Sequence, residues 1–182
     1  MKTSIEKIRL SHVKSFHDYD NKYKSDHWQR GYEKKNELLK FKNIENFRNN
    51  SLSDGLDTQP GSIKTQKKLY NQLKNEIGIK YLRENLSNSN IGKLKNVLRI
   101  QNKLIDPNAL FHIRQLYDIQ NQIKKINLKP KIICEIGAGY GALSRLLIKK
   151  YKNAKYIIYD LPEANYLSSY YLLKNNPKKK FL

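Results

Sequence analysis

A glycine-rich stretch from Glu135 to Gly141 is the part of the chain whose residue types and spacing suit ligand chemistry. It reads Glu-Ile-Gly-Ala-Gly-Tyr-Gly and follows directly on an apolar run. Glycine leaves the backbone open to close approach and tolerates positive φ. A helix that begins after such a turn adds free N–H groups and the positive end of its dipole. The pattern predicts a ligand-binding turn between a strand and a helix.

Two acidic residues accompany this turn and indicate which ligand it suits. Glu135 stands two residues before Gly137, and Asp160 follows about 20 residues after the turn, at the expected tip of the next strand. A dinucleotide fingerprint spaces its glycines G-x-G-x-x-G around a pyrophosphate, whereas Gly141 here comes one residue early. A carboxylate at position 135 would also repel a pyrophosphate. We therefore expect a cationic ligand such as S-adenosylmethionine, which carries an ammonium and a sulfonium.

Each acid also has a purely structural interpretation. Glu135 could be a strand-end acid that meets a nearby lysine, and Asp160 could cap the helix that follows it. An acid inside an apolar strand is costly without a partner, and a carboxylate at a strand tip can accept hydrogen bonds from both hydroxyls of a ribose. We favour the ligand-binding interpretation for both residues.

The elements that must position these residues begin near residue 129. We expect a strand over 132–136, a helix from about 141 to 151, a strand over 156–159, a helix opened by Pro162 and the start of a third strand at 180–182. Continuous apolar runs of this length are typical of parallel strands that are buried on both faces. Cys134, in the first strand, should then be a buried, inert thiol.

The region from 1 to 128 is predicted to be helical and polar. Residues 27–48 should form a helix, Ser62 should cap another that ends at Gly78, and Asp106 should cap a third that lies against the sheet or covers its ligand cleft. This division gives a helical region over 1–128 and a partial α/β domain over 129–182. The expected buried positions are Trp28, Leu38, Phe41 and Phe47; Tyr70, Leu73 and Ile77; and Ala109, Ile113, Leu116, Ile119 and Ile123.

The composition gives little support to nucleic-acid binding. The 182 residues carry a formal net charge of +20, with a pI near 9.9 and a mean hydropathy of -0.79. Lysines are scattered along the whole chain rather than gathered in one stripe, and the only dense run is at 178–180. A basic module that binds nucleic acid or another polyanion, with a vestigial α/β tail, stays as the alternative function. With no membrane span, no signal peptide and one cysteine, a cytoplasmic location without an internal disulfide is expected.

The two motifs together resemble those of a known enzyme class. Residues 135–141 and Tyr-Asp-Leu-Pro-Glu at 159–163 resemble the first two cofactor motifs of class I, Rossmann-like methyltransferases. The stretches at 46–48 and 52–56 make the chain similar to a bacterial family of sugar O-methyltransferases. The resemblance implies an S-adenosylmethionine-dependent enzyme that methylates a sugar for surface polysaccharide. It also implies these cofactor contacts: Glu135 near the methionine end, Gly137, Ala138, Gly139, Tyr140 and Gly141 in the turn, Asp160 on the ribose and Leu161 beside the adenine. Tyr140 could equally serve to pack the loop.

Four further points complete the sequence-based hypothesis. A class I methyltransferase sheet has seven strands, so we expect a truncated or split product with an exposed sheet edge and uncovered apolar surface; reading the DNA past codon 182 would test this. The catalytic base is not identified, because His112 is better read as a surface or packing residue. The spacing of His12, His17 and His27 predicts no metal site. A nicotinamide-dependent oxidoreductase is a third hypothesis, which the glycine spacing disfavours.

Overall fold

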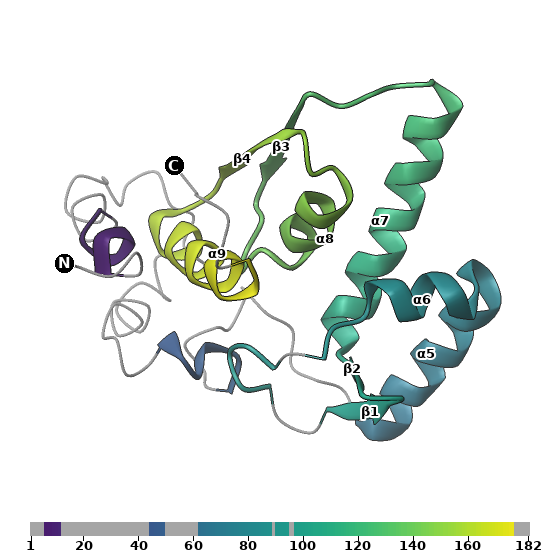
Figure 1. Ribbon diagram of the computed structural model, residues 1–182. Coiled ribbons are helices and arrows are strands. Elements are labelled where there is room, and N and C mark those ends of the chain that lie inside the picture. The colour runs from purple at the N-terminus through teal and green to yellow at the C-terminus, as the bar shows by residue number, and fades with distance from the viewer. Residues whose placement is uncertain (1–5, 12–43, 50–61, 89, 95–96, 177–182) are drawn as a thin grey trace, which may run out of the picture.

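The computed structural model describes residues 6–11, 44–49, 62–88, 90–94 and 97–176. This part of the chain combines helices with two small two-stranded sheets, β1–β2 and β3–β4 (Figure 1). A short helix covers 6–11. The labelled elements are η3 (Phe47–Asn49), α5 (Ile63–Ile77), α6 (Ile79–Asn85), β1 (Leu98–Ile100), β2 (Lys103–Ile105), α7 (Pro107–Lys125), β3 (Ile132–Ile136), α8 (Ala142–Lys150), β4 (Lys155–Tyr159) and α9 (Pro162–Asn175).

The predicted boundaries of the helices capped by Ser62 and Asp106 are confirmed, whereas the described end of the helix predicted over 27–48 is a turn at 45–46 followed by the 3-10 helix η3. The Ser62 side chain accepts a hydrogen bond from the Thr65 N–H at the start of α5, which ends at Gly78 with φ 87°. Asp106 caps α7 by accepting from the Asn108 N–H at 3.0 Å. Both apolar stripes face inward, since the described core includes Tyr70, Leu73, Ile77, Ile113 and Leu116.

An antiparallel hairpin, β1–β2, was not predicted, so the region from 1 to 128 is not purely helical. Leu98 pairs with Ile105 and Ile100 with Lys103, around a two-residue turn. Gln101 and Asn102 occupy this turn with φ of 49° and 61°. Positive φ at both central residues is the geometry of the tight hairpin turns that match strand twist. The sequence signal was therefore a short apolar alternation around an asparagine-containing turn.

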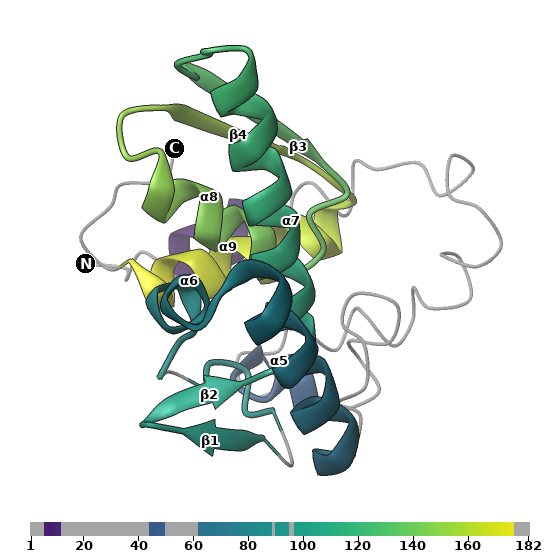
Figure 2. The ribbon, with the colours of Figure 1, turned by 90° about the vertical axis from the view of Figure 1, so that its right-hand side faces the viewer.

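The predicted strand–turn–helix–strand–helix order after residue 129 is confirmed. Strands β3 and β4 pair in parallel, with Ile132 opposite Lys155 and Ile136 opposite Tyr159. Helix α8 makes the connection between them, and α9 follows β4. Both views place α8 and α9 on the same side of the strand pair (Figures 1 and 2).

The prediction that these strands are buried on both faces is wrong. Burial alternates along β3, because the described helices cover only one of its faces. On the other face, Ile136 is 84% exposed, Tyr159 is 69% exposed and Ile132 is 63% exposed. Cys134 lies on that same face and is exposed, which corrects its predicted burial. The expected uncovered apolar surface is therefore present.

Two apolar clusters hold the described residues together. One joins Phe47 and Tyr140 to α9, and the other joins α5, α6 and α7 to α8 through residues such as Leu116 and Leu146. Helix α7 thus packs chiefly along α8 and α5 rather than on the sheet. Burying one such leucine fully is worth roughly 1.5–3 kcal/mol, so these contacts are the main support of the β3–α8–β4 unit.

Several predicted features lie outside the described residues. These are the greater part of the helix over 27–48, the Lys178–180 run, the third strand, the stretch at 52–56 and the residues Trp28, Leu38, Phe41, His12, His17 and His27. Within the described ranges, no helix is both long enough and apolar enough to cross a membrane.

Candidate functional site

The glycine turn connects β3 to α8 with three glycines at positive φ. The values are 72° at Gly137, 57° at Gly139 and 88° at Gly141, a region that side chains other than glycine adopt at a cost. A Cβ added at Gly137 would meet no atom within 4 Å, so the backbone there is open to approach. The turn is therefore accessible at Gly137, one of the residues predicted to contact the cofactor.

The N–H groups of the three glycines are not free, contrary to the expectation for this turn. Gly137 donates to the carbonyl of Tyr159 at 2.9 Å and Gly141 to the carbonyl of Ala138 at 2.9 Å. Gly139 donates to Oδ2 of Asp160 at 2.8 Å. A pyrophosphate needs such groups unoccupied. The turn as folded therefore suits a ligand that packs against the glycine Cα atoms. It suits less well a phosphate, which would need several unbonded N–H groups.

Asp160 stands just beyond the end of β4 and is tied to the turn. Its Oδ2 accepts from Gly139, and its Oδ1 accepts from the Leu161 N–H at 2.7 Å. The helix cap of α9 is Leu161 and involves no side-chain bond, so Asp160 is not the N-cap of this helix. Burial raises the pKa of Asp160 above its ordinary value; the two backbone bonds oppose this effect, and the charges of Glu163 and Glu135 add to it.

Glu135 is held by two hydroxyl groups rather than by a lysine. Ser144 on α8 donates to its Oε2 at 2.6 Å, and the Tyr156 hydroxyl donates to the same oxygen. Oε1 accepts no hydrogen bond from the described residues. A carboxylate that is fixed through one oxygen keeps the other available for a ligand cation.

The two carboxylates lie on the same face of the β3–β4 pair. Glu135 is in register with Ile158, and side chains in register on parallel strands point to the same side. Asp160 continues the alternation from Ile158 onto that side. The charge of Glu135 also contributes to the raised pKa of Asp160, in keeping with their shared face.

The Tyr140 side chain packs into the core, which favours its loop-packing role over direct contact with a ligand. It is 3% exposed. Its ring centroid lies 5.1 Å from that of Tyr171 and 5.7 Å from that of Phe47. Gly141 is also buried, and a Cβ there would come within 3.2 Å of the Ser168 Cβ. These two residues therefore anchor the turn onto α9, and Ala138 and Leu161 remain half-buried beside it.

Two residues in this site were missed by the sequence analysis, namely Tyr156 and Ser144. Tyr156 is two residues before Ile158 on the same face, so strand alternation could have placed it beside Glu135. Ser144 sits in the first turn of α8, and no local pattern in the sequence marked it as a partner of Glu135. His112 hydrogen-bonds Gln115 through Nδ1 at 2.7 Å on α7, as suits a surface role.

Comparisons with known proteins leave this site without a counterpart. No protein-family model, no curated protein and no solved structure matches the chain. The case for its function therefore rests on the residues and geometry described above.

Proposed function

We propose that this chain binds S-adenosylmethionine through the 135–141 turn and Asp160, as the cofactor-binding part of a class I, Rossmann-like methyltransferase. One observation carries the proposal. Glu135 and Asp160 come from successive parallel strands, share the helix-covered face and flank an open Gly137. Two acids beside a turn whose glycine N–H groups are already bonded favour a cationic adenosyl ligand over a dinucleotide.

Each residue has a separate task in this proposal. Glu135, fixed through Oε2 by Ser144 and Tyr156, holds the ammonium of the methionine portion with its second oxygen. Asp160 accepts hydrogen bonds from the ribose hydroxyls with lone pairs that Gly139 and Leu161 do not use. Gly137 lets the ligand approach the backbone.

The bound cofactor supplies an activated methyl group on its sulfonium. Transfer to a hydroxyl is an in-line displacement, so positioning provides most of the rate, and a general base need only remove the hydroxyl proton. We propose a sugar hydroxyl as the acceptor, on the sequence resemblance alone. The described residues supply the cofactor side of this reaction, and we assign no base among them.

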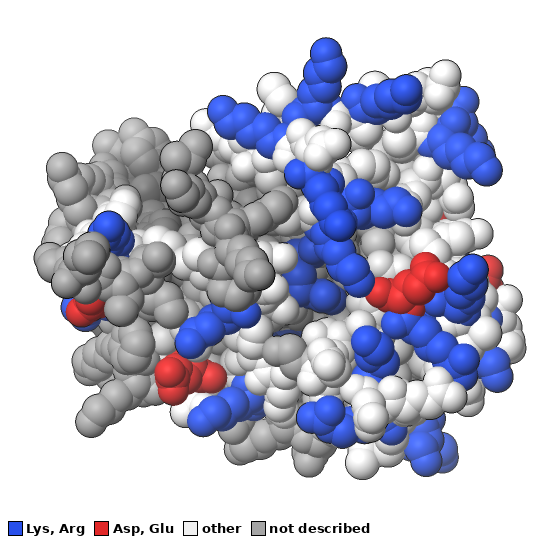
Figure 3. Space-filling model, viewed as in Figure 1, with Lys and Arg blue, Asp and Glu red and all other residues white. Residues whose placement is uncertain are grey.

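The basic charge supports the polyanion-binding alternative only weakly. On the face viewed in Figure 3, Lys and Arg are spread widely among uncharged and acidic side chains. Nucleic-acid-binding surfaces usually gather their cations along one groove or helix face. The net charge of +20 nevertheless makes the alternative worth testing in the same experiment.

Calorimetric titration of the full chain distinguishes these functions. We expect S-adenosylhomocysteine to bind with measurable heat, NADH to give none, and Glu135→Gln to weaken the binding because it removes the charge that faces the ammonium. Binding of NADH instead would support the oxidoreductase. Binding of RNA alone, with affinity that falls steeply as salt rises, would replace the methyltransferase proposal with the polyanion-binding one.

A further inference from the structure

A small cavity lies between η3, β2, the start of α7, α8 and α9. Its volume is about 10 Å³, room for roughly one water-sized guest. Arg48 from η3, Asp106 before α7, Arg145 on α8 and Tyr171 on α9 all contribute to its lining. Four segments that are distant in sequence thus meet around one enclosed space.

Positive charge exceeds negative charge in this lining. Arg48 pairs with Asp106, with 2.7 Å between Nη2 and Oδ2, and these side chains are only 4% and 10% exposed. Arg145 is also buried, at 9% exposed. Asp106 is the only acid among the described residues that line the cavity. The described lining therefore holds two guanidinium groups and one carboxylate, in an environment where buried charge is costly to leave uncompensated.

Arg145 donates a hydrogen bond to the Tyr171 hydroxyl, but part of its guanidinium is left without a partner among the described residues. Its Nε is buried and has no hydrogen-bond acceptor among the described residues. Its Nη2 reaches the Asn85 carbonyl only at 3.5 Å, the outer limit of a hydrogen bond. A buried guanidinium with an unused donor, beside a cavity with room for one guest, is a site that an anion would stabilise.

We propose that this cavity binds a small monovalent anion of about the size of chloride, held by Arg145 and Arg48. The cavity has no room for a phosphate, and gluconate is larger still. The anion would neutralise the excess charge and join η3 to α8 and α9. Because the Arg48 guanidinium carbon also lies 4.8 Å from the centre of the Tyr140 ring, the bound anion would help to hold the glycine turn. The proposal does not depend on which ligand that turn binds.

Thermal unfolding of the full chain tests the site directly. Chloride is exchanged for gluconate at constant ionic strength. We expect the Tm to rise with chloride and, above the Kd, to follow the logarithm of the chloride concentration, because a ligand at concentration c that binds only the folded state stabilises it by RT ln(1 + c/Kd). A general salt effect would instead change the Tm in proportion to the chloride concentration.

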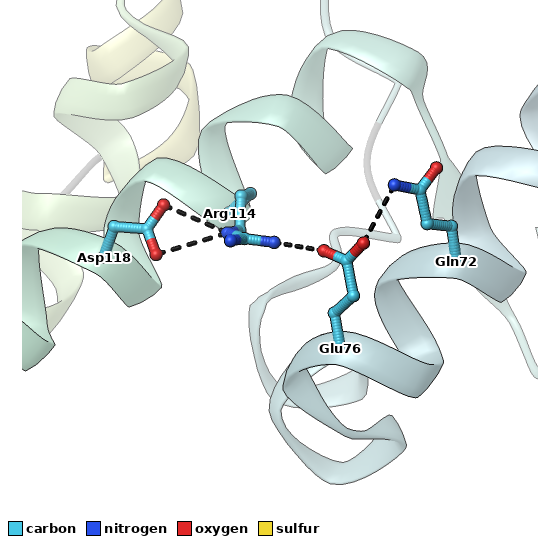
Figure 4. A network of polar contacts seen from close by, with 4 residues as sticks. All are labelled: Gln72, Glu76, Arg114 and Asp118. Atoms are coloured by element: carbon cyan, nitrogen blue, oxygen red, sulfur yellow. Dashed lines mark hydrogen bonds and ion pairs between the residues drawn. The ribbon is translucent and has the colours of Figure 1, made fainter.

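Substitution of Arg145 identifies the cation responsible. Arg145→Met should weaken the apparent chloride affinity at least about tenfold, the equivalent of 1.4 kcal/mol. The matched control is Arg114→Met on α7, whose guanidinium is exposed and bonded to Glu76 and Asp118 (Figure 4); this variant should keep the wild-type response. If Arg145→Met does not fold, the chloride-35 NMR linewidth measured with the wild-type protein replaces this test. Chloride that exchanges with the site broadens the line, and bromide but not phosphate should displace it and narrow the line. A Tm equal in both salts, an unchanged response in Arg145→Met, or the absence of bromide-sensitive broadening would overturn the proposal.

Discussion

The backbone N–H of Gly139 donates a hydrogen bond of 2.8 Å to Oδ2 of Asp160, which follows it by 21 residues. This bond ties the turn after β3 to the end of β4. It fixes the position of the Asp160 carboxylate and at the same time removes one N–H group that a phosphate would require. The chemistry of the candidate site follows from this arrangement, since an anchored acid stands where a phosphate cradle would otherwise form.

The affinity for S-adenosylhomocysteine should depend on pH through Asp160. Burial raises the pKa of this carboxyl, so its charge is lost at a higher pH than for an ordinary aspartate. Hydrogen bonds from ribose hydroxyls are stronger to the ionised group. We expect the affinity to be constant near neutral pH and to fall as the pH is lowered through that raised value, and Asp160→Asn should remove the dependence. A midpoint at or below the ordinary aspartate value would contradict this prediction.

The same shift has a consequence for folding. A raised pKa means that the folded state binds the proton more tightly than the unfolded state does. The Asp160 contribution to stability is therefore present at low pH and decreases as the pH rises through its folded-state pKa. A denaturant-unfolding series across this acidic range is run on the wild type and on Asp160→Asn. The slope of unfolding free energy against pH should be more negative in the wild type than in the variant, opposite in sign to ordinary acid denaturation. Equal slopes in the two proteins would count against the burial of the carboxyl.

Removal of the Tyr156 hydroxyl should weaken both the fold and the site. Tyr156→Phe deletes a donor to Oε2 of Glu135, and hydrogen bonds to charged groups contribute about 1.5–3 kcal/mol. We expect a loss of unfolding free energy of about that size and a weaker affinity for S-adenosylhomocysteine, because only Ser144 then fixes the carboxylate. The control is Tyr159→Phe on the exposed face of the same strand, which should change neither quantity. Equal behaviour of the two variants would show that Glu135 needs no positioning.

Two glycine substitutions should separate folding from binding. Gly137 and Gly141 both have positive φ, so alanine costs roughly 1–2 kcal/mol at either position. Only at Gly141 does the added Cβ also come within 3.2 Å of Ser168. Gly141→Ala should therefore lower the Tm more, whereas Gly137→Ala should keep more stability and lose ligand affinity through its new methyl group. A Gly137→Ala variant that binds S-adenosylhomocysteine like the wild type would place the ligand elsewhere.

The uncovered face of β3–β4 should promote self-association. Ile136 and Tyr159 are large, exposed and adjacent in register, and exposed apolar patches are liable to aggregate. The double variant Ile136→Thr, Tyr159→Thr should sediment with less self-association and with an unchanged Tm, because threonine suits a strand. Ile133→Thr on the covered face is the control and should lower the Tm. If the double variant also unfolds more easily, the face is not free in solution.

Local signals in the sequence were sufficient to predict much of this fold. The caps at Ser62 and Asp106, the stop at Gly78 and the bounds of β3 all depend on a few adjacent residues. Such features are decided by backbone geometry and short-range hydrogen bonds, so they can be predicted without knowledge of the tertiary structure.

Predictions that depended on distant packing were less successful. The apolar run of β3 correctly indicated a parallel strand, but it could not show that no described segment covers the side bearing Cys134. Ser144 was missed as a partner of Glu135 because it meets that residue only after α8 folds back over the strands. Tyr156 meets it only through the pairing of β4 with β3, whose register the sequence does not give. The Arg48–Asp106 pair likewise joins segments whose contact no local pattern reveals.

The most direct test of the proposed cofactor site is the Kd of S-adenosylhomocysteine for the wild type and for Asp160→Asn at neutral pH. Asp118→Asn, an exposed acid on α7, is the matched control for the lost charge. Two charge-assisted hydrogen bonds to the ribose predict a loss of at least about tenfold in Asp160→Asn and none in Asp118→Asn. Measurable wild-type binding that Asp160→Asn leaves unchanged, or a wild type that does not bind the ligand, would contradict the proposed site.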